Sequence, residues 1–172
     1  MQMRWIILFV LFFARTVMAF QFQSVAALSP QIVESLAVTL ADVGLLIGLY
    51  LGPGIVVAVG GGAVAMRFGD KRTVAASLAL MVVGGVIVAQ ATTLEAAIAG
   101  RLVSGVGGVV INVLMTKLVL DWFAKGGLST ALAIFISSWP LGIALSLLVL
   151  PSLAAYGGLG LAWNVLTGLT VA

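Results

Sequence analysis

Cysteine and histidine are both absent from this sequence of 172 residues. The chain therefore has no disulfide framework, no thiol nucleophile and no histidine for a metal site or catalytic triad. Charge is also scarce, since only 8% of the residues are charged and the net charge is +3. So small and scattered a positive charge is not the footprint of a nucleic-acid-binding protein. We expect no enzyme activity, no cofactor, no metal and no nucleic-acid partner.

Apolar residues are abundant instead, at 63% of the chain, with a mean hydropathy of +1.30. A soluble domain of this size would lack the polar residues that cover its surface. The composition predicts an all-α integral membrane protein with the lipid bilayer as its partner. The 21 glycines suit close helix packing in lipid, and Gly44, Gly48 and Gly52 predict a smooth stripe for a neighbouring helix. The alternative is a buried helical hairpin of a much larger soluble protein.

Six apolar stretches predict six transmembrane helices within one domain, residues 1–172. The predicted spans are 5–28, 43–65, 73–91, 96–118, 128–150 and 157–172. Ser29-Pro30 is expected to end the first span and Pro151 the fifth, with a connector over residues 31–42. The sixth stretch has about 15 residues, fewer than the ~20 that a span needs, so the chain looks truncated inside it. A cleaved signal peptide is the alternative for the first stretch, although Arg15 interrupts it.

The charges outside the spans predict the orientation. With alternate connectors on opposite sides, one side carries Arg4, Arg67, Lys71, Arg72, Lys117 and Lys125. The other side carries Glu34, Asp42 and Glu95 and no cation. We expect the chain in the plasma or inner membrane of the cell. The positive-inside rule then places the N-terminus on the cytoplasmic side.

The segment between the second and third spans carries a family resemblance. In the major facilitator superfamily, the loop between helices two and three has a characteristic order of residues. It consists of a glycine, three intervening residues, an acid, a base, any residue, a glycine and further basic residues. This sequence resembles that loop through Gly62, Arg67, Gly69, Lys71 and Arg72, while Met66 replaces the usual aspartate and Asp70 a common base.

Two later stretches resemble the same superfamily. The fourth span has Arg101 followed by closely spaced glycines, and the fifth contains Trp139-Pro140-Leu141-Gly142, similar to the antiporter Gly-Pro motif. The resemblance covers the whole chain and implies the N-terminal six-helix half of a secondary transporter. That half is expected to be a 3+3 inverted repeat. A faint internal similarity between Arg15-Thr-Val and Arg101-Leu-Val fits this repeat.

The resemblance also implies a conformational gate. The loop residues Gly62, Arg67, Gly69, Asp70, Lys71 and Arg72 are similar to the segment that locks the two halves of a carrier together on the cytoplasmic face. Asp121, at the end of the fourth span, is expected to pair with Arg67 or Arg72 across that face. Pro140 and Gly142 are assigned to the same conformational machinery.

Arg15 and Arg101 lie within the spans, and no acid does. Because an intramembrane ion needs a partner, two cations without a counter-acid favour a small anionic substrate. Gln21, Asn112 and Trp139 are expected to add neutral contacts. The arrangement is similar to the cyanate, nitrate and nitroimidazole porters of the superfamily. Transport would be by alternating access, with a missing C-terminal half or a second copy completing the site.

Other functions remain open from the sequence. Pro140 prompts a drug/proton antiporter half, which the lack of a buried acid disfavours. A non-transporting membrane subunit or scaffold, a small channel and an inactive fragment are further alternatives.

Overall fold

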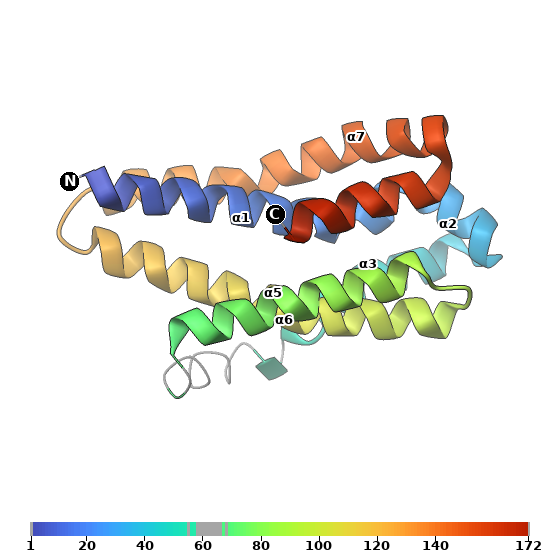
Figure 1. Ribbon diagram of the computed structural model, residues 1–172, viewed down its shortest axis with the longest axis horizontal. Coiled ribbons are helices and arrows are strands. Elements are labelled where there is room, and N and C mark those ends of the chain that lie inside the picture. Colours follow the sequence, from blue (N-terminus) through green and yellow to red (C-terminus); the bar gives the residue numbers. More distant parts are fainter. Residues whose placement is uncertain (1, 55, 58–66, 68, 172) are drawn as a thin grey trace.

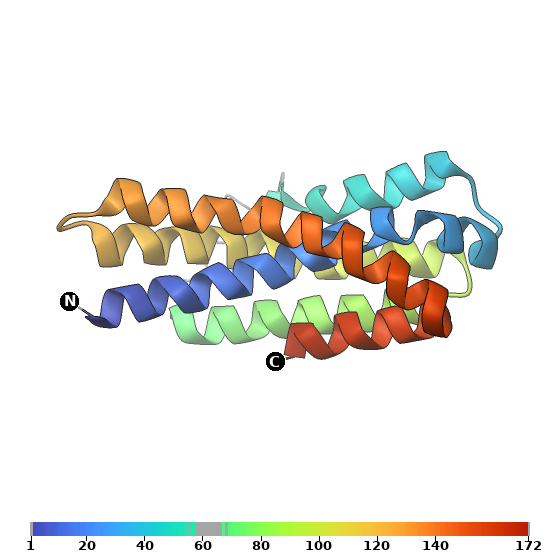
Figure 2. The same ribbon diagram turned by 90° about the horizontal axis from the view of Figure 1, so that it is seen from above.

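The computed structural model describes residues 2–54, 56–57, 67 and 69–171, and every regular element within them is a helix. The helices are α1 (Gln2–Ala27), α2 (Ser29–Leu36), α3 (Leu40–Leu51), α5 (Asp70–Ala89), α6 (Leu94–Phe123) and α7 (Leu128–Val171). The elongated bundle that they form is seen from two sides in Figures 1 and 2. This architecture confirms the prediction of an all-α membrane protein.

Four of the described helices, α1, α5, α6 and α7, are long and apolar enough to cross a membrane. A fifth span results if α2 and α3, bent by 115° at their junction, are counted as one broken span. The α7 helix is two arms, because Gly157 and Gly158 have non-helical dihedral angles. Gly158 has φ 76° and ψ 177°, a region that essentially only glycine occupies. The described residues therefore do not establish the predicted count of six.

The α1 helix ends at Ala27, close to the predicted end, and Pro30 lies in the first turn of α2, where its missing N–H costs nothing. The predicted connector over residues 31–42 contains most of α2 and the first turn of α3. Thr39 caps α3 by accepting a hydrogen bond from the Asp42 N–H, while Asp42 accepts one from the Thr39 N–H. This capping box fixes the start of α3 three residues before the expected span.

Two other helices extend beyond the ends predicted for them. The α7 helix continues through Pro151 as far as the break at Gly157. Proline removes one hydrogen bond, but ending the helix in lipid would leave several main-chain groups unsatisfied. The α6 helix continues beyond Leu118 to Phe123. Its 30 residues measure about 45 Å, longer than a hydrocarbon core of about 30 Å, so its charged end reaches the membrane surface.

The helices pair lengthwise, α1 with α7 and α5 with α6, and the second arm of α7 lies beside α5. The start of α1 meets the turn between α6 and α7. There the rings of Trp5 and Phe123 contact edge to face at 5.2 Å, and Arg4 Nη1 donates to the Gly126 carbonyl at 3.3 Å. Helix α2 and the turn between α5 and α6 lie at the opposite end (Figure 1).

Glycines make the closest helix contacts. A Cβ atom added at Gly84 would overlap the main chain of Gly100 and Ser104, and one at Gly107 would overlap the Ser77 carbonyl. These contacts bring α5 and α6 together at backbone distance. The predicted stripe behaves differently, because a Cβ at Gly44 or Gly48 would meet no atom within 4 Å. Within the described chain, that stripe packs against no neighbouring helix.

Candidate functional site

Arg15, near the middle of α1, joins three helices. Its Nε donates to Asn112 Oδ1 of α6 at 3.2 Å, and its Nη1 donates to the Phe135 carbonyl of α7 at 3.0 Å. Guanidinium has five N–H groups. Both N–H groups of Nη2 and one of Nη1 therefore have no partner among the residues that the structure describes. The side chain is half-buried, so these donors remain available.

Aromatic rings surround the Arg15 guanidinium. Its Cζ lies 4.4 Å from the ring centroid of Phe135 and 5.7 Å from that of Trp139. The negative face of each ring stabilises a cation, but neither ring neutralises its charge. Arg15 makes no ion pair within the described part of the chain. The arrangement holds an uncompensated positive charge with open hydrogen-bond donors, which is what an anion requires.

Arg101 of α6 has a different environment. Only 2% of it is exposed. Its Nε donates to the Leu46 carbonyl at 3.0 Å, its Nη1 to the Gln21 carbonyl at 3.4 Å and its Nη2 to the Phe22 carbonyl at 3.0 Å. Every nitrogen of the side chain is thus engaged, and α1, α3 and α6 are tied together at one point. The Tyr50 ring covers the guanidinium, 4.6 Å from Cζ.

Gln21 belongs to the Arg101 cluster. Its side chain is 2% exposed, and its Nε2 donates to the Met81 carbonyl of α5 at 2.8 Å. The structure therefore brings Arg15, Asn112 and Trp139 together, and it separates Arg101 and Gln21 from them. Substrate binding by any of the five stays a prediction. Phe135 and Phe22 were not among the predicted site residues. Phe135 supplies a carbonyl and a ring to the Arg15 cluster, and Phe22 supplies a ring; no pattern in the sequence marks either residue.

An aromatic row links the two clusters. Trp139 of α7 contacts Phe22 of α1 with ring centroids 5.4 Å apart, and Phe22 contacts Tyr50 of α3 at 5.5 Å. Trp139 neighbours Arg15 and Tyr50 covers Arg101. The row therefore runs from one intramembrane arginine to the other, across three helices.

The gate residues lie at the end of the bundle where α5 begins. Gly69 precedes α5 with φ 82°, the left-handed region that favours glycine. Asp70, in the first turn, binds Lys117 Nζ of α6 at 2.9 Å. Asp121 also lies near Lys117, at 3.7 Å. The exposed cations of this segment are Arg67, Lys71 and Arg72; Gly62 and Met66 lie outside the described residues.

Lys117 had no expected role beyond orientation, yet it is the centre of this charge cluster. The spacing of Lys117 and Asp121, one helical turn apart, is the sequence signal that could have indicated the contact. The pairing of Asp121 with Arg67 or Arg72 stays a prediction.

Gly142 of α7 lies against α1 next to Arg15. A Cβ at this position would overlap the Thr16 carbonyl and Ala19. Pro140 lies two residues earlier within the same helix and is exposed. Proline removes one hydrogen bond of the α7 ladder there. The helix is thus locally weakened where it touches the Arg15 site.

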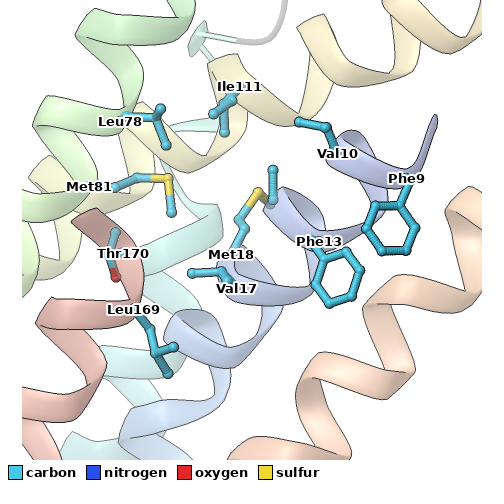
Figure 3. A pocket seen from close by; sticks show the side chains of 11 residues that line it. Phe9, Val10, Phe13, Val17, Met18, Leu78, Met81, Ile111, Leu169 and Thr170 are labelled. Carbon is cyan, nitrogen blue, oxygen red and sulfur yellow. The ribbon is translucent and has the colours of Figure 1, made fainter. Parts of the chain in front are cut away.

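A further groove lies apart from the Arg15 cluster. A cavity of about 430 Å³ separates α1 from α5, α6 and the last turns of α7 (Figure 3). Its lining is apolar apart from Thr170, whose hydroxyl donates to the Leu166 carbonyl of its own helix. No charged side chain lines it, so it offers nothing to orient an ion.

Long apolar helices, packed through glycines around two intramembrane arginines, define a multi-pass membrane protein. The family model of the Major Facilitator Superfamily matches residues 6–172, and the chain belongs to this superfamily. Members of the superfamily are transporters rather than enzymes, so the chain serves membrane transport. No curated protein matches the chain.

Proposed function

We propose that this chain is one half of a secondary carrier that moves a small anionic solute by alternating access, with Arg15 as the anchor of the anion. The observation that carries the proposal is Arg15 itself. It combines a positive charge within a span with open N–H groups and, among the residues that the structure describes, no counter-acid. This environment favours an anion and disfavours a cationic drug. The cyanate, nitrate and nitroimidazole porters that the sequence resembles suit the same chemistry.

Arg101 has a supporting role in this proposal. All its nitrogens are engaged by main-chain carbonyls, so it stabilises the bundle behind the site. In alternating access two halves move around a shared site, so a second six-helix half or a second copy would contribute the remaining contacts. The cluster of Asp70, Lys117 and Asp121 would hold the cytoplasmic face.

Binding tests the anchor directly. Radiolabelled cyanate and nitrate would be equilibrated with membranes containing the full chain, with Arg15→Gln and Arg15→Lys beside the wild type. We expect Arg15→Gln to lose at least about tenfold in affinity, and Arg15→Lys to recover only part, because lysine lacks the planar fork. Lys125→Gln, which removes an exposed cation, is the matched control. Unchanged anion binding in Arg15→Gln would show that the anchor is wrong.

Uptake tests the second part of the proposal, transport by alternating access. Proteoliposomes containing the full chain, loaded with unlabelled anion, would be assayed for exchange against labelled anion outside. Arg15-dependent exchange supports a carrier. Arg15-dependent binding with no exchange, in the presence of any second half that copurifies, would reject alternating access by this assembly.

A further inference from the structure

We infer that the ligand of the Arg15 site is a planar aromatic anion, an aryl carboxylate, and that Trp139 and Phe22 select it. The inference rests on the proposed function, because it assumes that Arg15 holds an anion. Its own basis is the geometry of the rings beside Arg15.

Trp139 and Phe22 form a single aromatic surface. Their ring centroids are 5.4 Å apart with the planes tilted by 36°. Rings this close leave no room for a third ring between them. Both side chains are half-buried, so each keeps an accessible part. A ligand ring therefore stacks on the open side of the pair, and it does not intercalate.

The distances match an aryl carboxylate bound to Arg15. The Arg15 Cζ lies 5.7 Å from the Trp139 ring centroid, and Phe22 continues the surface beyond it. A carboxylate held by guanidinium N–H groups places an attached benzene ring roughly 7 Å from Cζ. On the Trp139 side of the guanidinium, a ring at this distance would lie over Trp139 and extend toward Phe22. Cyanate and nitrate have no aromatic ring to stack on this surface.

Hydrogen bonds and a ring contact fix the position of the aromatic surface formed by Trp139 and Phe22. Arg101 Nη2 donates to the Phe22 carbonyl at 3.0 Å, and the Tyr50 ring packs edge to face on Phe22. On the other side Ser138, next to Trp139, is fully buried, and its carbonyl accepts from the Thr16 hydroxyl at 3.4 Å. Both rings are thus attached to rigid main chain. A preformed aromatic platform stabilises a stacked ring without a cost of ordering.

Benzoate and cyclohexanecarboxylate provide the test, because they share charge and carbon count and differ in planarity and π-electrons. Binding of each would be measured by competition against labelled benzoate, with the full chain in membranes. We expect the wild type to prefer benzoate by about tenfold. Trp139→Leu and Phe22→Leu should remove the preference while cyclohexanecarboxylate still binds, which also reports that the variants are folded. Trp122→Leu, at an exposed tryptophan near the end of α6, should keep the preference.

The outcomes separate this inference from the proposed function. Equal binding of both acids, or a preference that survives Trp139→Leu and Phe22→Leu, would overturn the aromatic platform. Arg15-dependent binding of nitrate or cyanate without binding of benzoate would also overturn it, and would leave the anion carrier standing. If no anion of any kind binds, both proposals fail.

Discussion

Lys117 Nζ of α6 lies 2.9 Å from the Asp70 carboxylate of α5, and the same ammonium lies 3.7 Å from Asp121. The two carboxylates come from different helices, so one lysine joins the start of α5 to the end of α6. The side chains of Lys117 and Asp70 are 48% and 35% exposed. Exposed pairs of this kind contribute about 0–1 kcal/mol to stability, so the contact is suited to being broken and remade.

The first prediction follows from this pair. Lys117→Gln and Asp70→Asn should each change the exchange rate several-fold, while thermal unfolding in detergent shifts little, since the pair is exposed. The double variant should resemble the single ones, because either substitution alone removes the contact. Lys125→Gln is the control. Additive effects of the two substitutions on the exchange rate would mean that the residues act independently.

The second prediction concerns Asn112. Asn112→Asp would place a carboxylate beside Arg15 Nε, where Asn112 Oδ1 now accepts at 3.2 Å. A carboxylate fixed there competes with a free anion at high effective concentration. We expect nitrate and benzoate binding to fall by more than about tenfold. Asn164→Asp, an exposed position on α7, should leave binding unchanged. Retained anion binding in Asn112→Asp would contradict a site at Arg15.

The third prediction concerns Arg101. Arg101→Gln leaves carbonyls of Gln21, Phe22 and Leu46 without their present donor in a buried setting. Leaving a buried acceptor without its donor costs about 1–3 kcal/mol. We expect a clear fall in the thermal unfolding temperature in detergent, followed by tryptophan fluorescence, and a smaller fall for Lys125→Gln. An unfolding temperature equal to that of the wild type would show that Arg101 does not hold the three helices.

The fourth prediction compares two glycines in helices. Gly84→Ala forces α5 away from the main chain of Gly100 and Ser104, and overpacking of this kind costs about 1–3 kcal/mol. Gly48→Ala adds a methyl group where no atom lies within 4 Å, and alanine is favoured over glycine in a helix by about 0.5–1 kcal/mol. Unfolding temperatures should move in opposite directions. A fall for Gly48→Ala would indicate an unseen neighbour at the open stripe.

Hydropathy was sufficient for the membrane class and for α1 and α5, because long charge-free stretches dominate those regions. It was insufficient at helix ends. The predicted connector contains Gln31, Glu34 and Ser35, whose polarity concealed the helix α2. The predicted end at Pro151 treated one lost hydrogen bond as decisive, whereas the rest of the ladder maintains α7 in lipid. The break occurs instead at Gly158, whose backbone conformation other residues avoid.

The sequence indicated Arg15, Asn112 and Trp139 as candidate residues, but it did not indicate which of the candidates lie together. Arg15 is conspicuous because arginine is costly inside a span. Its contacts with Asn112 and Phe135 join residues 97 and 120 positions apart, and no local pattern encodes such pairing. Arg101 had the same signal as Arg15, but its environment differs. Arg101 is only 2% exposed and each of its three nitrogens donates to a carbonyl, whereas Nη2 of Arg15 has no partner among the described residues.

Arg15 has no counter-acid within the described part of the chain, and this has an electrical consequence. A charge that moves across the whole membrane field changes energy by about 2.3 kcal/mol for each 100 mV. Under the proposed function, the empty site carries the fixed charge of Arg15, and a bound monovalent anion cancels it. Voltage would then act more strongly on the rearrangement of the empty protein than on that of the loaded one. The resting potential of the cell would set which way the unloaded carrier faces.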